Sequence, residues 1–352
     1  MNQQTNGSTD SLSEAPPNCS AEFVGDFVQR IYGIDGEVSQ LACERDQIFA
    51  IYTKTGEDFV LRLTNPAEQR QVTKFQTEAM RHLNRVNPEL PIPRVVLCEN
   101  GEAEIEVSLP DNRLSIARLI TLLPGVPLAS VPERAADVRA SMADAIAKMD
   151  HAFQNFFLPV ADHELLWDMK HTLKLRELVV YLQDDDTRKL VERGLHAFER
   201  NVAPIQLSLR AQVIHNDFNF SNVMIDEHKA EITGVLDFGD MVYAPLIYDL
   251  AVALAYQFSG DDDDALCVIE EFTLCYHRII PLQRQELEIL YDLITTRQVL
   301  TLLITQWRAS VYPQNRQYIL RNYATARVGI NRLAALGRDK VTQVLVRACL
   351  NH

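Results

Sequence analysis

The chain has 352 residues, of which 47% are hydrophobic and 23% are charged, and its formal net charge at pH 7 is −14. This length exceeds what one hydrophobic core usually holds, so two globular units are expected. The negative charge disfavours nucleic acid and anionic membrane surfaces as main partners, and it is compatible with a cationic substrate.

Targeting signals and cysteine patterns are absent from the sequence. No apolar run approaches the roughly 20 residues needed to span a bilayer. Residues 1–17 are polar and lack the apolar stretch of a signal peptide, so we expect a disordered tail there. The 6 cysteines form no CxxC pair, which argues against a disulfide framework or a zinc site. We therefore expect a cytoplasmic protein.

The first third of the chain alternates between strand and helix patterns. Ser20 can cap a helix that carries apolar residues at helical spacing and ends at Gly33. Residues 32–40 could supply backbone donors to phosphate, although they match neither a Walker A sequence nor GxGxxG. Pro124 and Gly125 form a break, which we take as the end of a first lobe. Strands are predicted at 47–53, 59–63, 94–98, 104–108 and 118–123, and a helix at about 67–85.

The chain after Gly125 is mainly helical. Its main β element is a hairpin with strands at 223–225 and 232–236 around a charged turn. The acidic run at 261–264 is expected to be a solvated loop. Helices are predicted at 132–153, 172–181, 187–202, 246–258, 265–278 and 283–309. These patterns predict an α+β protein with a small antiparallel sheet in the N-lobe and a larger helical C-lobe.

The sequence HNDFNFSN at 215–222 precedes the hairpin, and DFGD at 237–240 follows it. If the strands pair symmetrically about the turn, Asn222 faces Asp237 with Cβ atoms about 4.5–5.5 Å apart. One hard cation such as Mg²⁺ could then bridge their oxygens. Asp217 lies beside this position on the loop that enters the hairpin, as suits a general base. Asp, Asn and Gly are also ordinary turn residues, but their combination here favours phosphoryl transfer.

HNDFNFSN and LDFGD resemble the aminoglycoside phosphotransferase and choline kinase superfamily, which carries HxDxxxxN and has a bilobal protein-kinase-like fold. The resemblance is closest to the hydroxylysine kinase group and to kinase domains fused to class III aminotransferases. Softer similarities at 43–47, 59–65 and 166–168 extend it over most of the chain. The resemblance implies a nucleotide-binding N-lobe at 18–125 and a catalytic, substrate-binding C-lobe at 126–352.

The same resemblance implies the reaction and its partners. The enzyme would use Mg²⁺ to transfer the γ-phosphate of ATP or GTP to a hydroxyl group of a small amine or amino acid, as a monomer or homodimer. The leading acceptor is 5-hydroxylysine, and homoserine, choline-type alcohols and aminoglycosides remain open.

The resemblance also assigns the phosphate-binding residues. The nucleotide-binding cation falls at Arg62, where the family usually carries Lys; because Arg is a planar fork and Lys a compact charge, the exchange is not neutral. Glu78 in the following helix is the expected partner of Arg62. Arg45 is expected to reach phosphate, and Asp46 to fix its turn. The structural alternatives are that Arg62 is a solvated charge on its strand, that Glu78 lies on a solvated helix face, and that Arg45 and Asp46 belong to an ordinary surface turn.

Further roles are expected around the catalytic motif. His215 should orient the loop by hydrogen bonding rather than act as the base. Asp240 could contact a substrate ammonium group or cap a turn, and Asp249 resembles a residue that braces the catalytic loop. Substrate-pocket candidates in the helical lobe, with Arg engaging a carboxylate and Asp an ammonium group, are Trp167, Asp168, Arg297, Trp307 and Arg308.

Two other functions are considered. A catalytically silent, nucleotide-binding pseudokinase is suggested by Arg62 and by Ile48, which stands where the family has Asn; the intact catalytic motif counts against it. A protein kinase is a weaker alternative. Residues 240–245 run almost at once into the next helix and leave little room for an activation segment.

Overall fold

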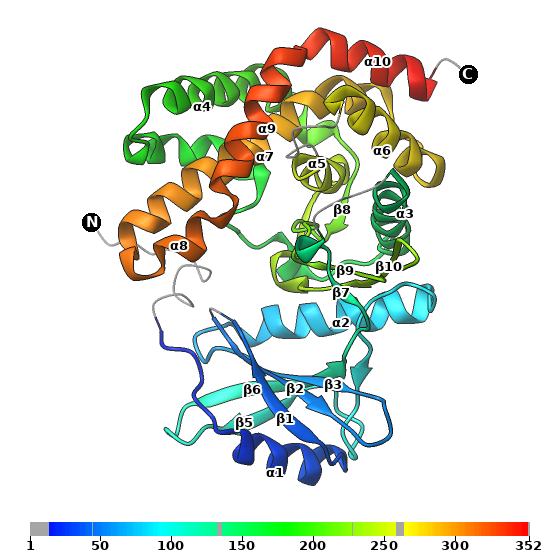
Figure 1. Ribbon diagram of the computed structural model, residues 1–352, viewed down its shortest axis with the longest axis vertical. Coiled ribbons are helices and arrows are strands. Elements are labelled where there is room, and N and C mark those ends of the chain that lie inside the picture. Colours follow the sequence, from blue (N-terminus) through cyan, green and yellow to red (C-terminus); the bar gives the residue numbers. More distant parts are fainter. Residues whose placement is uncertain (1–13, 44, 132–135, 227, 258–263, 351–352) are drawn as a thin grey trace.

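A six-stranded antiparallel sheet forms the core of the N-terminal lobe, with strand order β1-β2-β3-β6-β4 and β5 paired to β6. The computed structural model describes residues 14–43, 45–131, 136–226, 228–257 and 264–350. Figure 1 shows this lobe beneath a larger, mainly helical one. The strands are β1 (Glu37–Leu41), β2 (Gln47–Tyr52), β3 (Phe59–Leu63), β4 (Val95–Val96), β5 (Ile105–Ser108) and β6 (Leu114–Thr121). The strand β1 occupies the second half of segment 32–40, which was considered as a source of backbone donors to phosphate.

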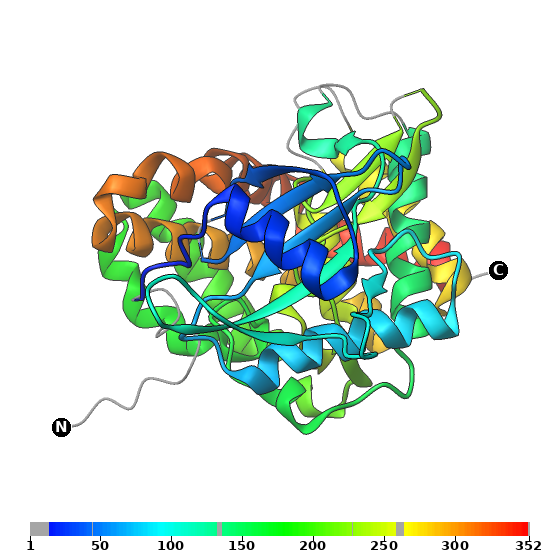
Figure 2. The ribbon, with the colours of Figure 1, turned by 90° about the horizontal axis from the view of Figure 1, so that it is seen from below.

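The two faces of the sheet have different chemistry because side chains alternate along each strand. Leu61 and Leu63 of β3 pack with the helix α1 (Ala21–Tyr32) in one apolar cluster. Figure 2 shows α1 lying across the strands. The Ser20 hydroxyl caps this helix and Gly33 ends it with φ 66°, as predicted. Arg62, between the two leucines, therefore belongs to the opposite face, which is turned toward the helical lobe.

The helix α2 (Arg70–Val86) links the two lobes. Its buried residues Phe75, Met80 and Leu83 belong to the large apolar cluster of the C-lobe and not to the cluster under α1. The ring of Phe75 stacks on Phe156 at 6.1 Å between centroids. The placement of α2 between sheet and C-lobe is visible in Figure 1. The two lobes are thus joined by a shared apolar core as well as by the chain.

The C-lobe is built around one long, buried helix, α7 (Arg284–Val311), whose neighbours include α5 and α9. Besides several short 3-10 turns, the other helical segments are α3 (Ala136–Ala152), η4 (Met169–Tyr181), α4 (Asp185–Ala197), η5 (Phe198–Val202), α5 (Ile247–Ala255), α6 (Ala265–Ile279), α8 (Arg316–Ile319), α9 (Tyr323–Leu336) and α10 (Arg338–Leu350). Of these, α8 to α10 lie beyond the last helix that the sequence predicted. The prediction for 132–153 holds for α3, and residues 132–135 lie outside the described part.

The predicted hairpin consists of β9 (Val223–Asp226) and β10 (Glu231–Val235), and the short strand β7 (Val126–Pro127) extends it. A second pair, β8 (Ala211–Ile214) and β11 (Val242–Pro245), lies beside it. The predicted register is wrong by one residue. At the turn, Glu231 pairs with Asp226, two residues away from the symmetric register, and the bulge between Ile232 and Gly234 reduces this offset to one. The N–H of Leu236, not of Asp237, therefore donates to the carbonyl of Asn222 at 2.7 Å.

The expected tail at 1–17 is described from residue 14 onward, and this part lies against the sheet. Arg113 donates to the carbonyls of Ala15 and Pro16 at 2.6 and 3.2 Å. Of the acidic run, only residue 264 is described. All 6 cysteines are free, as predicted. Within the described ranges, no helix has the length and apolar character needed to cross a membrane.

A substitution of Gly125, at the junction of the lobes, would test how closely the chain there packs against the hairpin. Its φ is 98°, and a Cβ there would lie 2.5 Å from the Ile225 carbonyl oxygen. Gly101 is the matched control, because its φ is 87° and a Cβ would meet nothing within 4 Å. We expect Gly101→Ala to cost about 1 kcal/mol from backbone strain alone, and Gly125→Ala about 2–4 kcal/mol because the hairpin must also shift. Urea denaturation measures both losses, and equal losses would contradict this account.

Candidate active site

The loop at 215–222 is held in place by the carboxylate of Asp249. Asp249, fully buried at the start of α5, accepts the N–H of His215 at 2.9 Å on one oxygen and the N–H of Asn216 at 2.7 Å on the other. Asn216 has the left-handed φ of 63°, a conformation that Asn tolerates better than most residues. This brace gives Asp249 the structural position that was expected of it.

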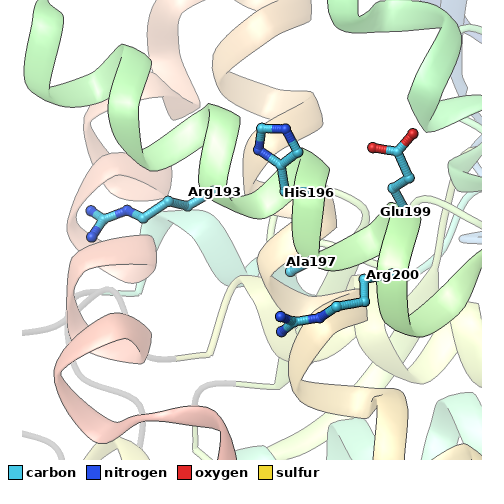
Figure 3. A pocket seen from close by; sticks show the side chains of 5 residues that line it. All are labelled: Arg193, His196, Ala197, Glu199 and Arg200. Carbon is cyan, nitrogen blue, oxygen red and sulfur yellow. The ribbon is translucent and has the colours of Figure 1, made fainter.

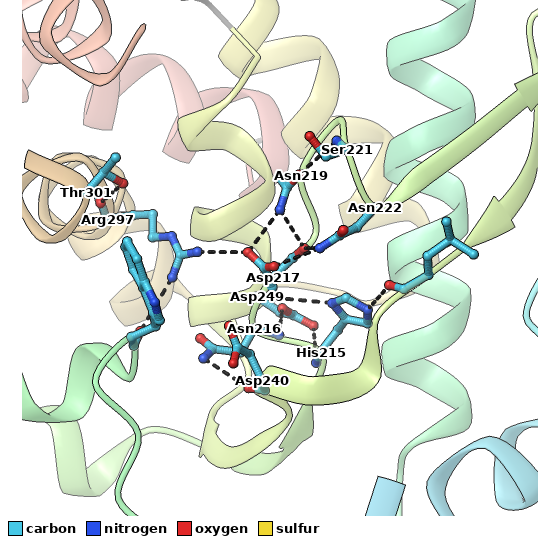
Figure 4. Close-up of polar contacts among 12 residues, drawn as sticks. His215, Asn216, Asp217, Asn219, Ser221, Asn222, Asp240, Asp249, Arg297 and Thr301 are labelled. Carbon is cyan, nitrogen blue, oxygen red and sulfur yellow. Dashed lines mark hydrogen bonds and ion pairs between the residues drawn. The ribbon is translucent and has the colours of Figure 1, made fainter. Parts of the chain in front are cut away.

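The carboxylate of Asp217 projects from this loop and accepts hydrogen bonds from three side chains (Figure 4). Asn219 Nδ2 and Arg297 Nη2 lie 3.0 and 3.1 Å from Oδ1. Asn222 Nδ2 lies 2.7 Å from Oδ2. The side chain of Asp217 is 21% exposed and that of Arg297 only 2%, so the pair is mostly withdrawn from water while one edge of the carboxylate stays accessible.

Asp217 titrates far from the ordinary range of an aspartate. Burial and the neighbouring carboxylates of Asp240 and Asp237 raise its pKa to about 7, against the opposing effect of Arg297. The folded protein therefore keeps a proton here that the unfolded chain releases at lower pH. Its stability falls as pH rises from about 4 to about 7 through this group. A carboxylate poised near neutral pH is suited to accept a proton.

His215 serves the loop rather than the open site. Its Nδ1 accepts the N–H of Asp217 at 3.3 Å, so we assign the proton to Nε2, which lies 3.0 Å from the Leu236 carbonyl. The ring is fully buried and packs edge-on against Phe238 at 5.2 Å. His215 thus links the catalytic loop to the end of β10.

Asn222 and Asp237 can still offer oxygens to one metal ion, although they are not directly paired. Since Asn222 donates through Nδ2 to Asp217, its Oδ1 is the atom left for a cation. Asp237 is exposed, has φ 56°, and accepts the N–H of Gly239 on Oδ1. In the described part of the chain, no three His, Cys, Asp or Glu side chains converge as a metal cluster. An amide and a carboxylate oxygen suffice for Mg²⁺, which usually completes its shell with water and phosphate.

The partner predicted for Arg62 is wrong. Arg62 forms an ion pair with Asp46, which is 5% exposed and lies in the turn before β2. Asp46 also accepts the N–H of Asn65 at 2.8 Å on its other oxygen. Glu78 instead pairs with Arg81, one turn along α2, at 2.9 Å, and both side chains are exposed. Asp46 precedes β2, the strand that pairs with β3, and so lies next to Arg62. It is therefore the acidic partner of Arg62 that Glu78 was expected to be.

A second arginine beside Arg62 was not predicted. Arg118 of β6 stands directly opposite Arg62 in the sheet and is 3% exposed. Its Nη1 donates to the Thr77 hydroxyl of α2 at 2.7 Å. Burial and the positive charge of Arg62 lower the pKa of Arg118 to about 10. The alternation of β6, which puts Arg118 between buried Ala117 and Leu119, was the signal that could have revealed it.

Arg45 extends the cationic side of the site toward the C-lobe. It is half-buried, and its charge lowers the pKa of Asp240. Burial and Asp237 act more strongly in the other direction, so the pKa of Asp240 is raised on balance. Charges from the turn before β2 and from the DFGD segment therefore act on each other across the lobes.

The substrate-pocket candidates divide into two groups. Trp167 and Arg297 meet next to Asp217: the guanidinium lies 5.0 Å from the centre of the indole ring. Asp168 is fully buried and caps η4 by accepting the N–H of Lys170 at 2.8 Å. Arg308 lies 11 residues beyond Arg297 on α7, about 16 Å farther along the helix axis. The assignment of Asp168 to a substrate ammonium group stays a prediction.

A surface pocket of about 510 Å³ lies elsewhere, on α4 and η5 (Figure 3). None of the residues described above lines it. Its acidic lining residue, Glu199, is already paired with Arg176 at 2.7 Å. Its lining residues are Arg193, His196, Ala197, Glu199 and Arg200.

Comparison with known proteins identifies relatives over almost the whole chain. The model of the phosphotransferase enzyme family (APH) matches residues 40–273. A hydroxylysine kinase of Danio rerio is 26% identical over 352 aligned residues, which cover 94% of this chain and 96% of that protein. These matches confirm the resemblance that the catalytic motif suggested.

Solved structures show the same fold. A microcompartment-associated aminopropanol kinase superposes with a TM-score of 0.66 at 15% identity, over 92% of this chain and 99% of its own. An amicoumacin kinase in complex with AMP-PNP and Ca²⁺ gives 0.64 at 15% identity, over 87% and 93%. The predicted bilobal, kinase-like α+β fold is confirmed.

The charges around Asp217 predict that two substitutions shift its pKa in opposite directions. Arg297→Gln removes a cation that favours the ionised form, so the pKa of Asp217 should rise above its value of about 7. Asp240→Asn removes a neighbouring anion, so that pKa should fall. Carbon NMR of labelled aspartates, without added divalent metal, measures both. Glu78→Gln, on the exposed side of α2, is the control and should leave the pKa unchanged. Shifts in the same direction for the first two variants would contradict this electrostatic account.

Proposed function

The chain belongs to the phosphotransferase enzyme family, and we propose that this kinase transfers the γ-phosphate of ATP or GTP to a hydroxyl group of a small amine or amino acid. The observation that carries the proposal is the arrangement of Asp217 beside Asn222 and Asp237 on a braced loop. Residues 18–125 would bind the nucleotide, and residues 126–352 would supply the catalytic groups and bind the acceptor.

The proposed mechanism assigns one task to each side chain of the C-lobe. Asp217 orients the acceptor hydroxyl and takes its proton as the oxygen attacks the γ-phosphorus in line. Arg297 and Asn219 hold the carboxylate in place through the bonds to Oδ1. Asn222 and Asp237 would hold Mg²⁺, which neutralises phosphate charge when bound. The raised pKa of Asp217, about 7, supports its role as a base at neutral pH.

The N-lobe is proposed to steady the phosphates with arginine instead of lysine. Arg62 keeps its planar fork fixed on Asp46, and the guanidinium can still present N–H groups to a phosphate because it carries five donors. Burial and Asp46 act on it in opposite directions, and its pKa is raised on balance, so it stays cationic. Arg45 would add charge from the preceding turn.

The acceptor is proposed to be a cationic hydroxylated amine or amino acid, with 5-hydroxylysine the leading candidate. The carboxylates of Asp217, Asp237 and Asp240 lie close together: Asp240 and Asp237 raise the pKa of Asp217, and Asp237 raises that of Asp240. An ammonium group near Asp240 would relieve this repulsion. The relatives named hydroxylysine kinase, in Danio rerio and in Mus musculus, support the choice. Because Arg297 is buried against Asp217, we assign it to the base and not to a substrate carboxylate.

A silent pseudokinase is the competing function, and Arg62 in place of lysine is the observation that favours it. The hydrogen-bonded Asp217 and the free oxygen of Asn222 weigh against it, because a chain under no catalytic demand need not keep a buried base next to like charges. A screen of hydroxylated amines with Mg²⁺, with ATP and GTP run separately, decides between the two. Nucleotide binding without transfer to any acceptor would favour the pseudokinase.

Asp217→Asn tests the base directly. We expect kcat to fall by about 100- to 10,000-fold, because proton transfer is lost, while the affinity for nucleotide stays nearly unchanged. Asp226→Asn, at the turn end of the same hairpin, is the control and should keep normal turnover. Near-normal phosphorylation by Asp217→Asn would remove Asp217 from the base role.

Asp46→Asn tests the phosphate-binding arginine. The ion pair with Arg62 is lost while the size of the side chain is kept, so the KM for nucleotide should rise about tenfold. Glu78→Gln is the matched control and should leave that KM unchanged, because Glu78 pairs only with exposed Arg81 among its described contacts. The reverse pattern, with Glu78→Gln impaired and Asp46→Asn normal, would show that α2 supports Arg62 after all.

A further inference from the structure

A buried carboxyl group beneath the catalytic loop has no task in the mechanism above. Asp150, near the end of α3, is fully buried. The hydroxyl of Tyr276 from α6 donates to its Oδ2 at 2.7 Å. Gln212 of β8, three residues before the catalytic loop, donates to its backbone carbonyl at 2.7 Å. Asp150 is thus fixed at the junction of three elements that surround the loop.

The surroundings of Asp150 Oδ1 indicate whether the carboxyl group is protonated or ionised. In the described residues, no N–H or O–H donor is directed at Oδ1. The carboxyl group of Asp249, itself an acceptor, raises the pKa of Asp150 both by its charge and by a side-chain hydrogen bond. Two carboxyl groups can share a hydrogen bond only if one of them carries the proton. Asp249 accepts a backbone N–H on each of its oxygens, which suits the ionised form. Asp150 is therefore the acid.

The surrounding charges agree with a neutral Asp150. Burial and the charge of Asp249 raise its pKa well above the usual range. The nearest cation, Arg210, acts in the other direction, but its guanidinium is bound by both oxygens of Glu286 from α7 at 2.7 and 2.9 Å. Tyr276 remains a donor because burial and Asp150 raise its pKa as well.

We propose that Asp150, as a neutral carboxylic acid, is a positioning residue for the catalytic loop. It donates its proton in a hydrogen bond to Asp249, and this bond orients the carboxylate that holds the N–H groups of His215 and Asn216. The next residue along the chain is Asp217, so the direction of the base depends on a relay that begins at Tyr276. This inference deepens the proposed function and rests on it for its effect on turnover.

The relay makes a distinct contribution to stability. The folded pair keeps one proton that the unfolded chain loses above about pH 4. Stability therefore falls as pH rises, by about tenfold in the folding equilibrium constant per pH unit, until the folded pair itself loses the proton. Asparagine is the neutral isostere of protonated aspartate and carries no such proton. Asp150→Asn should remove this part of the pH dependence, whereas Asp150→Ala removes the relay itself.

The experiment compares wild type, Asp150→Asn and Asp150→Ala in the full chain. Asp144→Asn, on the same helix and paired with Lys148, is the control. Asp150→Asn should keep kcat within about threefold, and Asp150→Ala should lower kcat by about tenfold or more with little change in KM. The ratio of the folding constants of Asp150→Asn and wild type should grow by about tenfold per pH unit from about pH 5 upward, until the folded carboxyl group itself loses its proton. At a pH above about 7, where Asp217 has lost its proton, the infrared absorption of protonated carboxyl groups should be weaker in Asp150→Asn than in wild type by the contribution of one group.

Two of these readouts do not need turnover, so they separate this inference from the proposed function. If no acceptor is phosphorylated but the infrared band and the pH dependence behave as stated, the relay stands and the kinase proposal fails. An unchanged infrared band in Asp150→Asn would overturn the inference. So would a pH dependence that is the same in Asp150→Asn and wild type, or a kcat as low in Asp150→Asn as in Asp150→Ala. If Asp150→Ala does not fold, the comparison of Asp150→Asn with wild type decides.

Discussion

The active site depends on the two hydrogen bonds between the Asp249 carboxylate and the catalytic loop. They fix the backbone at His215 and Asn216, where the chain adopts a left-handed conformation that it would otherwise avoid. Asp217 is the next residue in the chain, so these two hydrogen bonds also orient its carboxylate. Because Asp249 is fully buried, its bonds do not compete with water, and the loop is held rigidly enough to place a base.

The site is organised around like charges held close together. Asp217 and Asp240 both have raised pKa values, in part because each lies near other carboxylates. Arg297 and Arg45 offset this repulsion from opposite sides. The arrangement is costly in isolation and becomes favourable when cations enter, since both a metal ion and an ammonium group would relieve it. The same geometry would therefore suit both the divalent metal and the cationic acceptor of the proposed reaction.

The sequence predicted the parts of the site that are local in the chain. The motif around Asp217 and the hairpin after it follow from spacing and strand patterns. The partner of Arg62 could not be found in this way, because Asp46 and Glu78 are both acidic and near in sequence and only the packing of the sheet separates them. The shifted register arose from a turn tighter than the symmetric one, offset in part by a bulge, and strand alternation reveals neither. Asp150 lacks any local motif, and its role depends on contacts to α5 and α6.

Because Arg62 pairs with Asp46 and not with Glu78, a movement of α2 would act on the site differently than in a protein kinase. In protein kinases the phosphate-binding lysine pairs with a glutamate of the helix that follows it, so movement of that helix can switch the site on and off. Here Arg62 is held by a turn of its own sheet, while α2 packs into the core of the C-lobe through Phe75 and Leu83. A shift of α2 would therefore disturb the shared core before it released Arg62. With little chain between Asp240 and α5 to act as an activation segment, the site has the features of one that is assembled permanently.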